Sequence, residues 1–157
     1  MERTAAVLMV LAVVTACGGG VESDQTQVPA AAEGRGVILV QEAEAFPIEE
    51  ATGTYGIYMK INNDGAMLDR LVEATIDRCD ATELQETTNE NGAVRVTPVV
   101  GGIVIPPHST LVLGPGAVAV TCLGIAADVS EGDTLEVTLI FEQAGAQTVN
   151  ATVTSEL

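Results

Sequence analysis

Few side chains in this 157-residue chain can do chemistry: three cysteines, one histidine and four methionines. Thiol, thioether and imidazole groups are the soft ligands that Cu(I) prefers, and two thiols can also close a disulfide. With a single histidine, no Ser-His-Asp constellation can be assembled from spacing, and no glycine-rich phosphate loop precedes a helical pattern. The sequence therefore predicts a protein that is not an enzyme.

Cys17 ends a segment that is typical of a lipoprotein signal. Arg3 is followed by an apolar run from Ala5 to Val14, too short to span a bilayer comfortably, and small residues precede the cysteine. We expect cleavage before Cys17 and a lipid on its thiol; an ordinary secretory signal with an incidental cysteine is the alternative. Residues 1–16 are then a signal peptide, and residues 17–35 a flexible, lipid-anchored linker. This predicts an extracytoplasmic protein anchored to a bacterial membrane.

The chain is strongly acidic, with 22 Asp and Glu residues, 6 Lys and Arg residues and a formal charge of −16. A surface of this sign repels nucleic acid, so we expect no nucleic-acid partner. Solubility is the simplest reason for the charge, although an acidic surface also attracts cations. No acidic run has the spacing of a calcium loop, and Asn62-Asn63-Asp64-Gly65 is interpreted as a hairpin turn.

From Gly36 to Leu157, short β-branched and apolar runs alternate with Gly, Pro, Asn and Asp, and no helical period is sustained. The pattern predicts nine strands: 37–45, 54–62, 69–76, 82–88, 94–98, 110–113, 117–123, 134–142 and 147–153. Strands of this number and spacing favour one all-β domain, residues 36–157, folded as an antiparallel Greek-key β-sandwich. A small closed barrel is the alternative.

Several segments in this order resemble the PCu(A)C family of extracytoplasmic copper chaperones. The resemblance covers nearly the whole domain and rests on Tyr58 to Gly65 with Asp69 to Val72, Glu83 to Glu86, Gly101 to Pro107, Gly114 to Gly116, Leu123 to Ile125, Glu131 to Asp133 and Leu139 to Glu142. It implies a cupredoxin-like sandwich, which in typical members passes Cu(I) to the copper centre of a terminal respiratory oxidase.

The resemblance also assigns the positions where such members keep their copper ligands. Typical members use a His, a later Met and then a His-x-Met pair; the first two positions fall here on Gln85 and Val96, and the pair falls on Ala119 and Thr121. None of these four side chains is a good Cu(I) ligand. Residues two apart on a strand share a face and could grip one ion, but a methyl and a hydroxyl group cannot do so.

Three other side chains are weak metal candidates. His108 lies in a loop after two prolines, where a histidine is usually solvated, and Met59 lies in mid-strand, where a thioether usually packs in a core. Met67 follows the Asp64-Gly65 turn and is expected near the surface. If His108 and Met67 met at one end of the sandwich, they could form a displaced copper site.

Cys79 and Cys122 are the remaining thiols, and outside the cytoplasm two such thiols normally form a disulfide. We expect Cys79 just before the strand that carries Gln85, and Cys122 on the strand that carries Thr121 but on its opposite face. A structural bridge is favoured. A reduced dithiol that binds Cu(I) and two free buried thiols are the alternatives.

Two functions follow from these patterns. The first is copper delivery or buffering at the cell surface through a rebuilt site, with Cu(I) as cargo and a respiratory oxidase or another extracytoplasmic protein as partner. The second is a protein-interaction or assembly module on the same fold, with the usual Cu(I) site lost. The residues favour the second, because a fold can persist after its site has changed.

Overall fold

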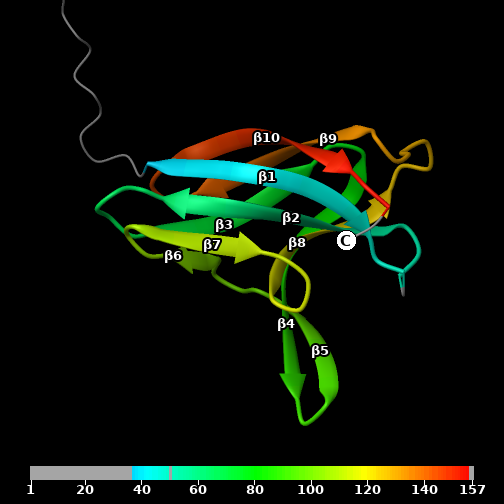
Figure 1. Ribbon diagram of the computed structural model, residues 1–157, viewed down its shortest axis with the longest axis horizontal. Coiled ribbons are helices and arrows are strands. Elements are labelled where there is room, and N and C mark those ends of the chain that lie inside the picture. The colour runs from blue at the N-terminus through cyan, green and yellow to red at the C-terminus, as the bar shows by residue number, and fades with distance from the viewer. Residues whose placement is uncertain (1–36, 50, 156–157) are drawn as a thin grey trace, which may run out of the picture. The chain divides into compact units, whose positions relative to one another are not determined.

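The computed structural model describes residues 37–49 and 51–155, which belong to one unit, Ala32–Leu157. The predicted signal peptide, the linker and Cys17 lie outside the described residues. Ten strands make up the described part (Figure 1): β1 Ile38–Pro47, β2 Thr54–Asn63, β3 Asp69–Ile76, β4 Cys79–Glu90, β5 Ala93–Pro98, β6 Ile103–Ile105, β7 Ser109–Leu113, β8 Val118–Ile125, β9 Thr134–Phe141 and β10 Gly145–Val153. None of these residues forms a helix long and apolar enough to cross a bilayer.

The strands follow one hydrogen-bonded path in the order β5-β4-β8-β2-β1-β10-β9-β3-β6, and β7 pairs with the second half of β2. All pairs are antiparallel except β1 with β10, which is parallel. The path folds over so that two layers share one core, which confirms the predicted all-β, cupredoxin-like sandwich. The outer strands β5 and β6 do not pair with each other, so the path does not close into a barrel.

Much of the core is built by alternation along the strands. On β2, Ile57, Met59 and Ile61 are buried while Lys60 between them is exposed. On β9, Leu135, Val137, Leu139 and Phe141 are all buried. Aliphatic side chains from both layers therefore fill the space between them, as the scarcity of aromatic residues in the sequence requires.

Two buried polar side chains hold the loops at the ends of the strands. Asn63 donates to the carbonyl oxygens of Met67, Ile105 and Pro106, and the Asp69 carboxylate accepts the backbone N–H groups of Arg70, Gln143 and Ala144. Both residues are fully buried, so these bonds replace the hydration that the two groups lose.

The structure corrects three details of the strand prediction. The strand β6 was missed, and β4 begins at Cys79, so Cys79 lies within the strand that carries Gln85 and not before it. The Asn62–Gly65 segment is not a hairpin turn, because β3 pairs with β6 and β9 and not with β2. Asn63 instead uses its side chain to fix this connection.

Two features stand out at β4. A disulfide joins Cys79 of β4 to Cys122 of β8, with the two Cα atoms 5.8 Å apart, as the sequence favoured. Beyond its pairing with β8, β4 continues with β5 as a hairpin that extends away from the other strands (Figure 1). Asn91 and Gly92 both have positive φ at the tip, which is the type I′ turn that an Asn-Gly pair favours.

Removing the disulfide should lower stability without changing the fold. The bridge closes 43 residues, and the chain-entropy relation gives a loss of about 4 kcal/mol for the Cys79→Ala/Cys122→Ala variant. Urea unfolding of the chain from residue 17, carrying Cys17→Ser in both proteins, measures the difference. An unchanged unfolding midpoint would contradict this role for the bridge.

Candidate functional site

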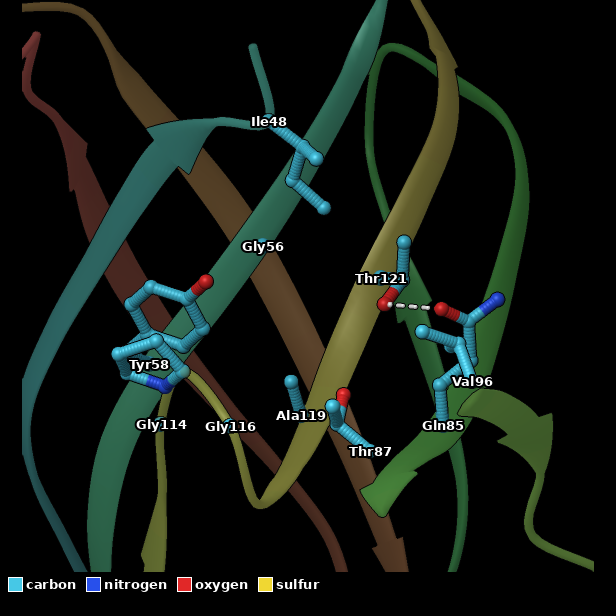
Figure 2. Close-up of a pocket in the computed structure, with 11 residues that line it drawn as sticks. Ile48, Gly56, Tyr58, Gln85, Thr87, Val96, Gly114, Gly116, Ala119 and Thr121 are labelled. Carbon is cyan, nitrogen blue, oxygen red and sulfur yellow. Dashed lines mark hydrogen bonds between the residues drawn. The ribbon is translucent and has the colours of Figure 1, made fainter. Parts of the chain in front are cut away.

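A pocket of about 250 Å³ opens on the outer face of the layer that contains β4, β8 and β2 (Figure 2). It is lined by Ile48, Gly56, Tyr58, Gln85, Thr87, Val96, Gly114, Pro115, Gly116, Ala119 and Thr121. All four positions to which the family resemblance assigns copper ligands line this one pocket. The structure thus brings together, in one pocket, the four residues that the resemblance singled out.

The register of three strands brings these four positions together. Gln85 on β4 pairs with Ala119 on β8, and Thr87, two residues further along β4, pairs with Val96 on β5. Thr121 lies two residues after Ala119, so both side chains leave β8 on the same face. The two-residue spacing on β8 and the pairing of β4 with β8 and β5 thus place all four side chains at the pocket.

A hydrogen bond between β4 and β8 spans the pocket wall. The Thr121 hydroxyl donates to the Gln85 side-chain oxygen over 3.0 Å, as Figure 2 shows, and the Gln85 amide nitrogen donates to Glu83 over 2.9 Å. Both polar ends of Gln85 are therefore engaged within the protein. Thr121 is almost completely buried, so this bond also satisfies a hydroxyl that has lost its contact with water.

Tyr58 forms the opposite side of the pocket. Its ring stacks on Phe46 with ring centroids 5.4 Å apart, and it lies over Gly56, where an added Cβ atom would come within 2.7 Å of the Tyr58 hydroxyl oxygen. Gly56 is thus needed for the ring to lie where it does. Burial raises the pKa of Tyr58, so the phenol stays protonated at neutral pH and offers a hydrogen-bond donor.

The lining suits an uncharged group better than a cuprous ion. Amide, hydroxyl, isopropyl and methyl groups stand where imidazole and thioether ligands would be needed, and no described lining residue is charged. Hydroxyl groups of Tyr58 and Thr87 and the apolar Ile48 and Val96 provide a mixed surface. Such a surface can bind a neutral side chain or a peptide group.

The weak metal candidates lie elsewhere. Met59 is buried in the core, as expected of a packed thioether, whereas Met67 and His108 are exposed in two loops that the Asn63 side chain links through Met67 and Pro106. Within the described part of the chain, no group of three or more His, Cys, Asp and Glu side chains is arranged to hold a metal ion.

The disulfide lies on the other face of β8 from the pocket. Cys122 is fully buried in the core next to Thr121, which lines the pocket, so alternation separates the two functions of this strand. With both sulfur atoms bonded to each other, neither Cys79 nor Cys122 provides a thiolate for copper.

Little in the sequence indicated the side of the pocket that Tyr58 forms. Tyr58 alternates with buried Ile57 and Met59, which places it on the outward face, and Gly56 precedes it on that face. Strand alternation cannot show, however, that the segment around Ile48 and the turn at Gly114–Gly116 cover this outward face. The covering segments come from distant parts of the chain, and only the fold brings them together.

The chain is similar to proteins that are described as putative lipoproteins. The sequence pattern of the family described as "Putative lipoprotein LpqE-like" matches residues 21–153. A relative from Leifsonia xyli subsp. xyli, named "Putative lipoprotein Lxx21020", is 28% identical over 149 residues, which cover 94% of this chain and 86% of the relative.

Solved structures with the same fold are PCuAC domains. The copper-bound PCuAC domain from PmoF2 is 24% identical with a TM-score of 0.62, and it covers 78% of this chain and 96% of its own. The apo PCuAC domain from PmoF1 is 23% identical with a TM-score of 0.64 and coverages of 78% and 97%. Cu(I)-bound DR1885 from Deinococcus radiodurans is 22% identical with a TM-score of 0.57 and coverages of 82% and 85%. These likenesses show that the chain has the fold of PCuAC domains.

The burial of Tyr58 predicts how stability changes with pH. The unfolded phenol ionises near pH 10, whereas the folded phenol keeps its proton to a higher pH, so the free energy of unfolding falls as pH rises between the two pKa values. Tyr58→Phe removes this ionisation and should flatten the dependence from about pH 9 to 12. Urea unfolding across this range, with Tyr55→Phe as the matched control, measures the effect. Equal slopes in wild type and Tyr58→Phe would contradict it.

Proposed function

This chain belongs to the LpqE-like family of putative lipoproteins, and from this membership we propose that it is a non-enzymatic, extracytoplasmic lipoprotein whose copper-chaperone fold now recognises a protein partner instead of carrying Cu(I). Residues 1–16 are the signal peptide, residues 17–35 the linker and residues 36–157 the displayed domain. The lipid on Cys17 holds the protein at a bacterial membrane.

One observation carries this proposal: the four positions expected to bind copper converge on one pocket, and none of them offers a soft ligand. Gln85 and Thr121 satisfy each other by a hydrogen bond, while Val96 and Ala119 supply only hydrocarbon. Cu(I) takes thiolate, thioether and imidazole ligands in preference to these groups. The donor set of the pocket therefore does not fit a cuprous ion.

The copper-delivery function requires ligands from elsewhere in the chain. The disulfide occupies both domain thiols, and Met59 is buried in the core, which leaves exposed Met67 and His108 as soft donors among the described residues. Two such donors on loops make a weaker site than the four converging ligands of a typical family member. Delivery of Cu(I) to an oxidase by this chain is accordingly the second candidate.

Restoring the family's ligands tests the proposal. We expect the Gln85→His/Val96→Met/Ala119→His/Thr121→Met variant to bind one equivalent of Cu(I) in competition with a Cu(I) chelator, because the pocket already positions these four side chains. The chain from residue 17 with Cys17→Ser and an intact disulfide should leave the copper with the chelator at the same concentrations.

A matched control moves a ligand pair to another exposed strand. Thr110→His/Val112→Met on β7 creates a His-x-Met pair without the other two positions and should not retain copper. Tight Cu(I) binding by the wild-type chain would refute the loss of copper function; if that binding disappeared in His108→Ala, it would identify the displaced loop site instead.

A further inference from the structure

The β4–β5 hairpin has one face that is continuous with the pocket. Cross-strand pairs place Gln85 opposite Pro98, Thr87 opposite Val96 and Asn89 opposite Val94, and these six side chains make up what we call the pocket face of the hairpin. Gln85, Thr87 and Val96 also line the pocket. The pocket face carries no charge, although the chain as a whole has a formal charge of −16.

Within the paired segments Gln85–Glu90 and Ala93–Pro98, the charged side chains lie on the other face; Glu83, which precedes these segments, accepts a hydrogen bond from Gln85. Glu86, Glu90 and Arg95 occupy the alternate positions of the two strands and are all exposed. Val94 and Val96 on the pocket face are also exposed, by 68% and 53%. A neutral, apolar strip thus runs along an acidic protein from the pocket toward the hairpin tip.

The backbone of β5 presents unused hydrogen-bonding groups next to this strip. β5 is an outermost strand of the sheet and pairs with β4 alone. Since the Val99 N–H donates to the Leu84 carbonyl, the same register makes Thr97 and Arg95 the residues whose backbone groups face β4. The N–H and C=O groups of Val94 and Val96 therefore point outward, away from the sheet.

This edge lacks most of the features that normally protect an edge strand. Proteins commonly block such edges with lysine, proline, a bulge or a covering loop. Pro98 ends the edge and Arg95 points to the charged face, but the pairing of β4 with β5 runs without a register shift from Gln85–Pro98 to Glu90–Ala93. The edge from Val94 to Val96 is consequently open to another strand.

We propose that the edge of β5 and the pocket face bind an extended, uncharged segment of a partner protein, which adds to the sheet as a further strand. The inference rests on the proposed recognition function and identifies its surface. Outward groups of Val94 and Val96 form the main-chain hydrogen bonds, and an aromatic or β-branched side chain of the segment lies over Val96 toward the pocket. Alternating neutral residues in the segment match the neutral strip, whereas an acidic segment is repelled by the chain.

A second copy of this chain fits the edge less well. Antiparallel pairing of two β5 strands that matches Val94 with Val96 would place the two Arg95 side chains directly opposite each other on the same face. It would also bring together two chains that each carry a charge of −16. A partner of different charge avoids both costs.

Selection of random 12-residue peptides displayed on phage against the chain from residue 17, carrying Cys17→Ser, tests the inference. We expect enrichment of peptides that lack acidic residues and alternate β-branched or aromatic residues with neutral polar ones. Synthetic copies should bind at least tenfold more weakly to Val94→Pro, which removes one outward N–H, and to Val96→Glu. Binding should persist in Val112→Glu, which changes a valine of similar exposure, 56%, on β7, outside the proposed surface.

Hydrogen exchange gives a second readout that depends on the register. Without peptide, the amides of Arg95 and Thr97 should be protected and those of Val94 and Val96 unprotected; peptide should protect the latter pair. Three outcomes would each overturn the inference. The selection could show no enrichment, or the enriched peptides could bind Val94→Pro and Val96→Glu as tightly as they bind wild type. The chain could also form concentration-dependent dimers that Val94→Pro abolishes. None of these outcomes depends on Cu(I) affinity. The proposed loss of copper binding is tested separately, by the chelator titration.

Discussion

The register between β4 and β8 is the constraint on which the pocket, the disulfide and the hairpin all depend. In this register Gln85 faces the pocket beside Ala119 and Thr121, while Cys122 faces the core. A slip of one residue would exchange the two faces of a strand, burying a polar group and exposing a cysteine. The disulfide lies on the core side and excludes that slip, so the residues on the pocket side can change without loss of the pairing.

The free energies of two interactions between β4 and β8 show how little the fold depends on the pocket residues. The Gln85–Thr121 hydrogen bond contributes roughly 0.5–1.5 kcal/mol, as such bonds usually do. The bridge between Cys79 and Cys122 contributes about 4 kcal/mol to the same pair of strands. The pairing of the two strands therefore depends on their backbone register and on the bridge, and little on the side chains that line the pocket. Neither a metal ion nor a particular residue at positions 85, 96, 119 and 121 is required to keep them paired.

Local patterns in the sequence predicted most of the strands, and long-range contacts account for what was missed. Alternation identified β2 and β9 because buried residues recur at every second position over seven residues in each strand. β6 has only three residues, Ile103–Ile105, between a glycine pair and a proline pair, so its turn residues outweighed its strand residues. The Asn63 region was interpreted as a hairpin because its turn chemistry is local, whereas the partners of β3 are β6 and β9.

For the site, the resemblance identified four pocket positions. Tyr58 and Thr87 line the pocket together with Ile48 and Gly114–Gly116, and no local pattern in the sequence connects these residues to one another.

Charge explains why a neutral surface at this place is informative. An acidic chain repels acidic partners over about 8–10 Å at physiological salt, so most of its surface favours basic partners or none. The pocket face of the β4–β5 hairpin differs, because Glu86, Glu90 and Arg95 all lie on the opposite face. Main-chain hydrogen bonds at the edge of β5 do not depend on side-chain charge, and the pocket next to it selects by shape and hydrogen bonding. Recognition at this surface would thus be set by the conformation and neutrality of the partner segment, while the rest of the acidic domain discourages less specific contacts.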